Sequence, residues 1–216
     1  MKIILAGYRQ WALKSFDQLI KKYPHIDFKI VKTQKDLLNF KNSIILCAGW
    51  SWIFKKKYIE NNEIICLMHP SDLPNYAGGS PIQNQIIEGV EETKATLFKA
   101  DCNIDTGPIL KKTRISLSGN LEQIFLELER VTVILFSYFI DKYPNNTIKY
   151  SEQIVTKTYK RLKPSQSELT KSMVNSMTTK QIYDFIRCRT DPYPNVYLED
   201  HTGRIYFKEV KFEKDE

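Results

Sequence analysis

The chain has 216 residues, of which 42% are hydrophobic and 12% aromatic, and it carries a net charge of +7. This composition can bury a sizeable core, which excludes disorder along the whole chain. The longest apolar run, residues 131–140, is shorter than the roughly 20 residues that a membrane span needs, so we expect no membrane partner.

The charge and the cysteines narrow the class of protein further. The lysines are dispersed in short runs, so we interpret the positive charge as a solvated surface that suits anionic substrates, with no nucleic-acid partner. The cysteines Cys47, Cys66, Cys102 and Cys188 form none of the close pairs typical of metal sites. Since the N-terminus also lacks the features of a signal peptide, the sequence indicates a cytoplasmic protein with reduced thiols and no metal.

The first half of the chain alternates short apolar segments with helical patterns. Residues 2–6, 28–31, 44–48 and 64–68 are almost continuously apolar, which is typical of strands buried on both faces of a parallel sheet. Apolar residues between the first two segments recur at helical spacing. With right-handed crossovers, this pattern predicts an α/β fold with a Rossmann-like, doubly wound, mostly parallel sheet.

Three loops follow the carboxyl ends of these strands, at residues 7–9, 49–52 and 69–80. The third loop ends before Pro81, which can occupy the first turn of a helix. Ligands of doubly wound sheets bind beyond these strand ends, so we expect the functional site among these loops.

The sequence then predicts a further pair of strands over residues 95–99 and 109–117 and a long core helix over residues 121–142. An Asp-rich loop separates the two strands. We expect residues 1–145 to form the catalytic domain, because the character of the sequence changes to a polar stretch after this point.

The remaining residues, 146–216, predict a small C-terminal extension packed on the core. It contains a short helix over residues 178–187 and a β-hairpin that pairs residues 196–198 with residues 205–210. The turn between the two strands contains Gly203.

Only one of the three histidines lies at a position suited to chemistry. His25 follows a proline before a strand and His201 lies in the hairpin turn, so we interpret both as structural. His69 comes directly after a buried strand, at the edge where sheet ligands bind. Asp105 lies in a turn before a strand, where it is either an ordinary turn cap or a catalytic carboxylate.

Two motifs around His69 and Asp105 resemble those of the folate-dependent formyltransferase family. Residues 69–83 read HPSDLPNYAGGSPIQ, and residues 104–110 read IDTGPIL. The resemblance implies the formyltransferase fold and the formyl donor 10-formyltetrahydrofolate, whose formyl carbon is attacked by a substrate amine. It implies that His69 donates to the tetrahedral oxyanion or relays a proton. Asp105 would hold His69 in its working tautomer and help to take the proton of the amine.

One position departs from the family's pattern. The family's asparagine lies two residues before the histidine, where this sequence has Leu67. Losing an oxyanion donor costs roughly two to three powers of ten in rate. Either another donor substitutes, for which Gln83, Asn84 and Asn103 are the polar neighbours in the sequence, or the chain is slow or catalytically impaired. We interpret Asp72, where many relatives have an apolar residue, as a turn cap.

The resemblance also implies which residues bind the two substrates. The family binds folate through the loop after the third strand and the loop before the catalytic aspartate, which here correspond to Gly49, Trp50, Ser51, Trp52, Ile53, Asp101, Asn103 and Ile104. The two tryptophans offer flat faces to a pterin ring, and ordinary packing is an equally good reading of each. The residues expected at the acceptor are Arg9, Trp11, Tyr76 and Asn84.

The tail of the sequence favours an amino sugar as the acceptor. Residues 159–164 and 183–197 are similar to the tail of sugar N-formyltransferases. Methionyl-tRNA formyltransferases carry an additional RNA-binding domain, for which we expect too few residues here. We therefore predict transfer to a small-molecule amine, an amino sugar that is free or nucleotide-linked, and we leave a homodimer open. The alternatives are another small amine as acceptor, a catalytically impaired folate-binding protein and an RNA-binding module.

Overall fold

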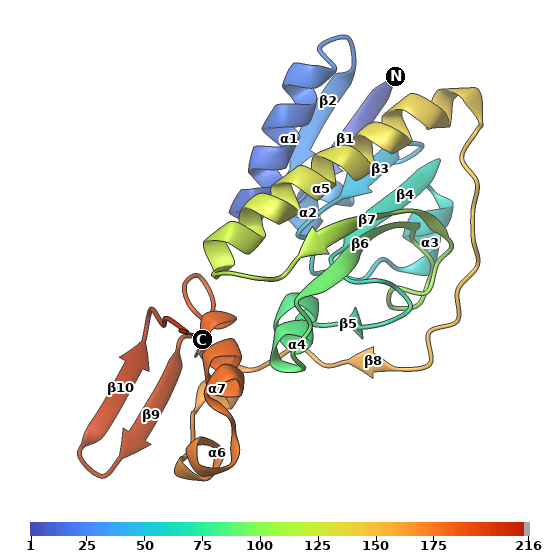
Figure 1. The fold of residues 1–216 in the computed structure, drawn as a ribbon. Helices are drawn as coiled ribbons and strands as arrows, with labels where there is room; N and C mark the ends of the chain where they lie inside the picture. The colour runs from blue at the N-terminus through green and yellow to red at the C-terminus, as the bar shows by residue number, and fades with distance from the viewer. Residues whose placement is uncertain (214–216) are drawn as a thin grey trace.

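A computed structural model describes residues 1–213 and places a six-stranded sheet at the centre of the fold (Figure 1). The strand order is β2-β1-β3-β4-β6-β7. The strands are β1 (Lys2–Ala6), β2 (Asp27–Val31), β3 (Ile44–Cys47), β4 (Ile64–His69), β6 (Glu92–Lys99) and β7 (Ile109–Ser116). The first four pair in parallel, whereas β6 and β7 are antiparallel additions.

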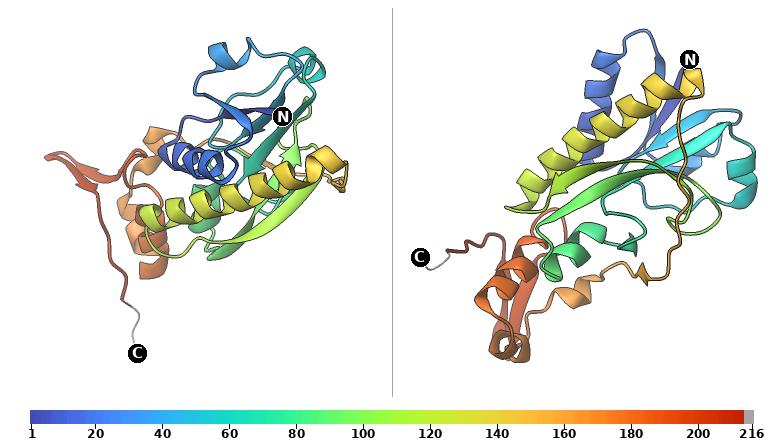
Figure 2. Two further views of the ribbon diagram at one scale, coloured as in Figure 1. Left: turned by 90° about the horizontal axis from the view of Figure 1, so that it is seen from above. Right: turned by 45° about the vertical axis from the view of Figure 1, so that its right-hand side comes forward.

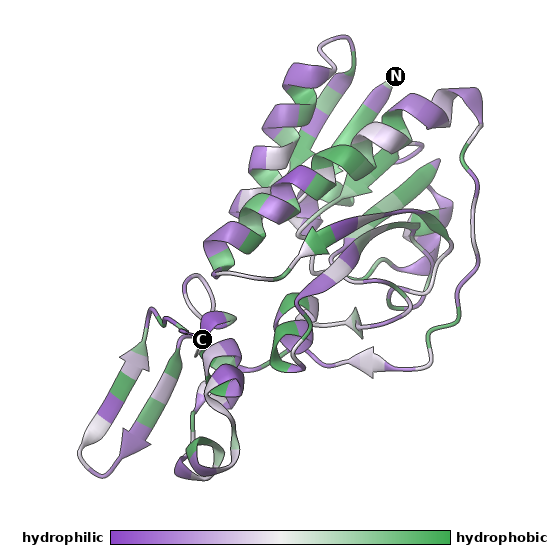
Figure 3. Cartoon of the chain, viewed as in Figure 1, coloured by the Kyte–Doolittle hydropathy of each residue, from purple (hydrophilic) through white to green (hydrophobic). Residues whose placement is uncertain are grey.

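Successive residues of the central strands point to opposite faces, and helices cover both faces. Ile3 and Leu5 belong to the core cluster under α1 (Gln10–Lys22) and α5 (Leu121–Lys142). Ile4 and Ala6 belong to a second cluster with side chains of α2 (Gln34–Leu37) and α3 (Lys56–Glu60). The apolar colour of the central strands in Figure 3 reflects this two-sided burial, so the predicted doubly wound α/β sheet is confirmed.

The second strand is less buried than its apolar sequence predicts. The side chains of Asp27 and Lys29 are exposed, and only Val31 is buried. The physical reason is the topology, because β2 forms one edge of the sheet and contacts only β1. An edge strand tolerates polar residues that a central strand excludes.

The long helix α5 has the predicted bounds, Leu121–Lys142. The Asn120 side chain accepts a hydrogen bond from the Gln123 backbone amide at 3.0 Å, and Gln123 Oε1 accepts one from the Asn120 backbone amide at 3.0 Å. In both bonds the backbone amide is the donor. This capping box satisfies two amides that the helix leaves free and so defines where it begins.

After η1 (Tyr143–Asn145), the chain returns along the carboxyl edge of the sheet, in the lower part of Figure 1. There β8 (Thr158–Tyr159) pairs in parallel with β5 (Ala77–Gly78), which follows His69. The nearby α4 (Pro81–Ile87) begins at Pro81 as predicted.

The C-terminal part contains η2 (Pro164–Ser167), α6 (Lys171–Ser176), α7 (Thr179–Arg187) and a hairpin of β9 (Val196–Asp200) and β10 (Gly203–Phe207). The hairpin projects away from the sheet in both views of Figure 2. Two details correct the prediction: the sequence did not predict α6, and the second hairpin strand ends at Phe207, because β9 provides paired residues only from Val196 onward.

Candidate active site

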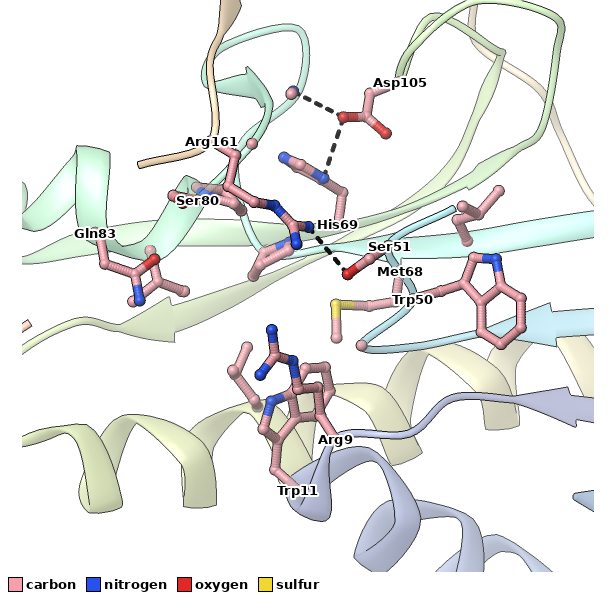
Figure 4. Close-up of a pocket in the computed structure, with 18 of the residues that line it drawn as sticks. Arg9, Trp11, Trp50, Ser51, Met68, His69, Ser80, Gln83, Asp105 and Arg161 are labelled. Carbon is pink, nitrogen blue, oxygen red and sulfur yellow. Dashed lines mark hydrogen bonds and ion pairs between the residues drawn. The ribbon is translucent and has the colours of Figure 1, made fainter. Parts of the chain in front are cut away.

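The histidine and the aspartate of the two motifs meet at the carboxyl edge of the sheet. His69 is the last residue of β4, its residue surface 7% exposed, and Asp105 lies in the loop between β6 and β7. His69 Nδ1 lies 3.4 Å from Asp105 Oδ2, and the Gly78 backbone amide donates to the same oxygen at 2.8 Å. Figure 4 shows both contacts as dashed lines.

Both ring nitrogens of His69 face oxygen atoms. Nε2 lies 3.0 Å from the carbonyl oxygen of Tyr76, which can only accept a hydrogen bond. If Nε2 carries the ring proton, Nδ1 is left as a base that faces the Asp105 carboxylate. The pair is therefore arranged to hold one additional proton between Nδ1 and Oδ2, which is what a base for an attacking amine requires.

The loop that carries Asp105 is held from several sides. Asp105 has a φ of +55°, a left-handed conformation that needs support from its surroundings. The Gln153 amide donates to the carbonyl oxygens of Asp105 at 3.1 Å and Gly107 at 2.6 Å. A Cβ on Gly107 would lie 1.8 Å from the Lys99 carbonyl oxygen, so only glycine fits here.

The loop that follows His69 is fastened by Asp72 and by the returning chain. Burial would raise the pKa of Asp72, but hydrogen bonds from Lys112 and Lys94 outweigh it and hold this pKa below its ordinary value. Asp72 therefore anchors the loop to β6 and β7 as well as occupying a turn. A Cβ on Gly79 would lie 2.4 Å from the Arg161 backbone nitrogen, so this glycine allows the close approach of the returning chain.

Two cavities meet at His69 and Asp105. The first, of about 340 Å³, is lined by Arg9, Trp11, Gln83 and Tyr193 among others. The second, of about 460 Å³, is lined by the loops that contain Trp52 and Ile104. The residues that line both cavities are Trp50, Ser51, Leu67, His69, Gly78, Gly79, Phe98, Asp105 and Arg161.

Most of the residues expected at the two substrates lie along these cavities. Arg9, Trp11 and Gly49 line the first cavity, and Trp50 and Ser51 line both. The residues of this set that line only the second cavity are Trp52, Ile53, Asp101, Asn103 and Ile104.

Tyr76 and Asn84 lie outside the lining of both cavities, in contrast to the expectation that they contact the acceptor. The Tyr76 ring stacks on Tyr159 with 5.0 Å between centroids, and its hydroxyl donates to Glu88 at 2.7 Å. The Asn84 amide donates to the Gly79 carbonyl oxygen at 2.8 Å. Both side chains are therefore occupied by the protein itself.

The structure also adds two polar side chains to the first cavity. Gln83, which the sequence suggested only as a substitute donor, is 6% exposed, and its Nε2 has no partner among residues 1–213. Arg161 was not expected at the site, although it lies within the stretch that resembles the sugar N-formyltransferase tail. Its Nη2 donates to Ser51 Oγ at 3.0 Å, and Ser51 Oγ lies 2.5 Å from the Tyr8 hydroxyl.

Neither metal ligands nor a membrane span are found in the described part of the chain. Residues 1–213 contain no cluster of three or more His, Cys, Asp or Glu side chains that could hold a metal ion. No helix among them is long and apolar enough to cross a membrane. The four cysteines are free, and only Cys102 is exposed.

Comparisons with known proteins point to one family. A family model described as formyl transferase matches residues 27–126. The methionyl-tRNA formyltransferase of Wolbachia pipientis subsp. Culex pipiens is 25% identical over 191 residues, which cover 83% of this chain. This chain spans 32% and 58% of the length of the first two curated relatives that it matches.

Solved structures agree with this result. A methionyl-tRNA formyltransferase from Clostridium thermocellum has a TM-score of 0.83 and 29% identity, covering 99% of this chain and 94% of that one. An N-formyltransferase from Helicobacter canadensis, solved with folinic acid and dTDP-3-aminofucose, has a TM-score of 0.68 and 20% identity, covering 87% of this chain and 80% of that one. The predicted formyltransferase fold is thereby confirmed.

Proposed function

We propose that this chain, of which residues 27–126 match the formyl transferase family model, moves the formyl group of 10-formyltetrahydrofolate onto the amine of an amino sugar, nucleotide-linked in its natural form. The observation that carries the proposal is the His69–Asp105 pair, which lies where two cavities meet. One cavity can hold the donor and the other the acceptor, so that the reacting atoms meet beside a base.

The second cavity suits the formyl donor, which is a substrate of the reaction. This family takes its formyl group from 10-formyltetrahydrofolate, and the Helicobacter canadensis relative was solved with folinic acid, a formylated folate. Trp52 and Phe54 line the second cavity together with the exposed loop residues Ile53 and Ile104. Aromatic faces and backbone hydrogen-bonding groups match the flat, polar pterin ring.

The first cavity suits a small acceptor with an anionic group. Its volume of about 340 Å³ falls at the lower end of small-molecule sites, which run from roughly 300 to 1,000 Å³. Trp11 and Tyr193 offer aromatic faces to a sugar ring, and Arg9 offers a guanidinium to a phosphate. The dTDP-3-aminofucose bound by the Helicobacter canadensis relative has groups that match these side chains, namely an amino sugar ring and a nucleoside diphosphate.

In the reaction, the acceptor nitrogen forms a bond to the formyl carbon, and the carbonyl electrons move onto the formyl oxygen. The His69–Asp105 pair takes a proton from the nitrogen. The carbonyl then reforms, the bond from the formyl carbon to N10 of the folate breaks, and N10 receives a proton. The products are the formylated amine and tetrahydrofolate, so atoms and charge balance.

A turnover assay tests the proposal. The chain is incubated with 10-formyltetrahydrofolate and dTDP-linked amino sugars, and tetrahydrofolate release is measured. We expect turnover, and we expect His69→Asn and Asp105→Asn to reduce it at least about a hundredfold, because general base catalysis contributes roughly 10² to 10⁴ in rate. Asp36→Asn, on the exposed surface far from β4 in sequence, is the matched control. Binding of folinic acid without any turnover would instead indicate a catalytically impaired binding protein.

Methionyl-tRNA is the second candidate acceptor, because several curated relatives that match this chain are methionyl-tRNA formyltransferases. The same assay with formylatable methionyl-tRNA decides between the two. Affinity for a tRNA would fall steeply with salt because many phosphates are contacted, whereas a dTDP-linked sugar carries only two. Faster transfer to methionyl-tRNA than to every sugar in the panel would reassign the acceptor.

A further inference from the structure

The site lacks the side-chain amide that the family places two residues before the histidine. Leu67 occupies this position, lines both cavities and, like Trp50, packs against the apolar cluster beneath α2 and α3. A tetrahedral oxyanion needs hydrogen-bond donors, because negative charge develops on the formyl oxygen during attack. A donor must therefore come from another residue at the place where the cavities meet.

Most donors at this junction are already used by the protein. The Gly78 amide donates to Asp105, and the Gly79 amide donates to the Tyr159 carbonyl oxygen at 2.8 Å. The Trp50 indole nitrogen has no partner in the described residues, but it is covered by surrounding atoms and does not reach either cavity surface.

The substitutes suggested by the sequence do not reach the junction either. Asn84 lies outside both cavities, Asn103 lines only the second, and Gln83 lines only the first. His69 itself has Nε2 directed at the Tyr76 carbonyl oxygen, and its Nδ1 faces Asp105. Its proton-bearing positions are therefore committed to the base.

Arg161 differs from all of these groups. It lines both cavities and is exposed, so that a ligand can reach its guanidinium. A guanidinium carries five N–H donors and a permanent positive charge. Within residues 1–213 its side chain makes one hydrogen bond, to Ser51 Oγ. In Figure 4 the guanidinium extends between His69 and Ser51, into the space where the reacting atoms would meet.

The backbone on both sides of Arg161 is fixed to the loop of the catalytic histidine. On one side, Tyr159 pairs with Gly78 in the β5–β8 ladder. On the other side, the Leu162 amide donates to Ser80 Oγ at 3.1 Å. A donor held in this way needs little reorganisation when charge develops, which is what makes oxyanion stabilisation effective.

We infer that the guanidinium of Arg161 is the oxyanion donor that replaces the amide missing at Leu67. The inference rests on the proposed function. When the acceptor nitrogen bonds to the formyl carbon and the carbonyl electrons move to oxygen, Arg161 N–H groups donate to that oxygen. Arg161 neither gains nor loses a proton, because its N–H groups only share theirs with the oxyanion. Arg161 is thus a catalytic residue that comes from a segment outside both sequence motifs.

Single-turnover transfer from 10-formyltetrahydrofolate to a dTDP-linked amino sugar tests the inference with four variants. We expect Arg161→Ala to reduce the transfer rate by roughly 10² to 10³, while folinic acid affinity changes less than about threefold, because the interaction forms only as charge develops. Arg161→Lys should retain part of the rate. Lys163→Ala, an exposed cation on the same segment that lines neither cavity, should change nothing.

The decisive variant is the double substitution Leu67→Asn with Arg161→Ala. If Arg161 replaces the amide, restoring asparagine should recover at least about tenfold of the lost rate. If Arg161→Ala does not fold, as judged by thermal melting, the same comparison is made with Arg161→Lys. An unchanged rate in Arg161→Ala would overturn the inference, as would a loss confined to the acceptor KM, because such a loss means acceptor binding. Absence of turnover in the unaltered chain would refute the proposed function itself.

Discussion

Breaking the buried ion pair between Asp184 and Arg187 should loosen the C-terminal segment and weaken acceptor binding. Arg187 is 4% exposed, and its Nε donates to Asp184 Oδ1 at 2.6 Å. Its Nη1 donates to the carbonyl oxygens of Leu117 and Gly119, each at 2.7 Å. These contacts attach α7 to the loop that joins β7 to α5. Tyr193, which lines the first cavity, follows α7 by a few residues.

The magnitude follows from the burial of the pair. Asp184→Asn leaves a buried guanidinium without its carboxylate, which costs about 3–5 kcal/mol. For a chain of this size each kcal/mol lowers the melting temperature by roughly 2–4 °C, so we expect a decrease of about 6–20 °C. We also expect a higher KM for the acceptor and an unchanged affinity for folinic acid, because the second cavity does not include Tyr193.

Differential scanning calorimetry and acceptor titrations measure the two effects. The control is Glu127→Gln, which breaks a more exposed ion pair to Arg130 and should cost at most about 1 kcal/mol. Replacing both members of the buried pair, with Asp184→Leu and Arg187→Met, should recover part of the stability, because no buried charge is then left alone. A melting temperature for Asp184→Asn equal to that of the control would refute the reasoning.

Three further outcomes are expected. Gly79→Ala should reduce formyl transfer at least about tenfold with intact folinic acid binding, because its Cβ would collide with the backbone of Arg161. Gly89→Ala has a left-handed φ of +80° but no atom within 4 Å of its Cβ position, so it controls for backbone strain away from the site, and equal transfer rates in the two variants would contradict the expectation. The lowered pKa of Asp72 means that its stabilising effect is fully present above its ordinary value of 3.8 and is lost as the pH falls through the lower folded-state pKa. Below pH 4, the melting temperature of Asp72→Asn should therefore depend less on pH than that of the unaltered chain. Parallel curves of melting temperature against pH would argue against a stabilising role of the Asp72 carboxylate. Cys102 is the exposed thiol and should react first with Ellman's reagent, whereas a buried thiol reacts slowly; burial raises the pKa of Cys188, for example, to about 12. If the fast phase persists in Cys102→Ser, Cys102 is not the fast-reacting thiol.

The parts of the fold that could be predicted are those whose signals are local. The bounds of α5 followed from a long apolar pattern that is contained within the helix itself. The exposure of β2 could not be predicted in the same way, because Phe28, Ile30 and Val31 have the composition of a central strand. Its position at the edge depends on which strands pair, and this is a property of the whole sheet.

The same distinction applies to the site. His69 and Asp105 could be predicted from the sequence, because each lies within a short motif whose residues also shape its own loop. The place of Arg161 at the site could not be predicted, because it depends on the parallel pairing of β5 with β8, two short strands far apart in the sequence. Tyr76, in contrast, was predicted at the site but lies outside it. Its residue type and position suggested a contact with the acceptor, but its ring stacks on Tyr159 and lines neither cavity.

The two cavities are lined by different parts of the chain, and this follows from the topology. The strands and loops up to Gly107 build the second cavity and the base, except for the segment 158–161, which closes one side. The first cavity is lined in addition by Leu128, Leu162 and residues 192–194. Changes in the C-terminal segment can therefore alter the acceptor cavity while leaving the His69–Asp105 pair in place. We infer that residues beyond 146 largely determine acceptor choice in this chain, whereas the chemistry of the formyl group needs residues before 110 together with Arg161. Substituting residues 192–194 by other amino acids should accordingly change the KM for the acceptor and leave the rate of the chemical step nearly unchanged.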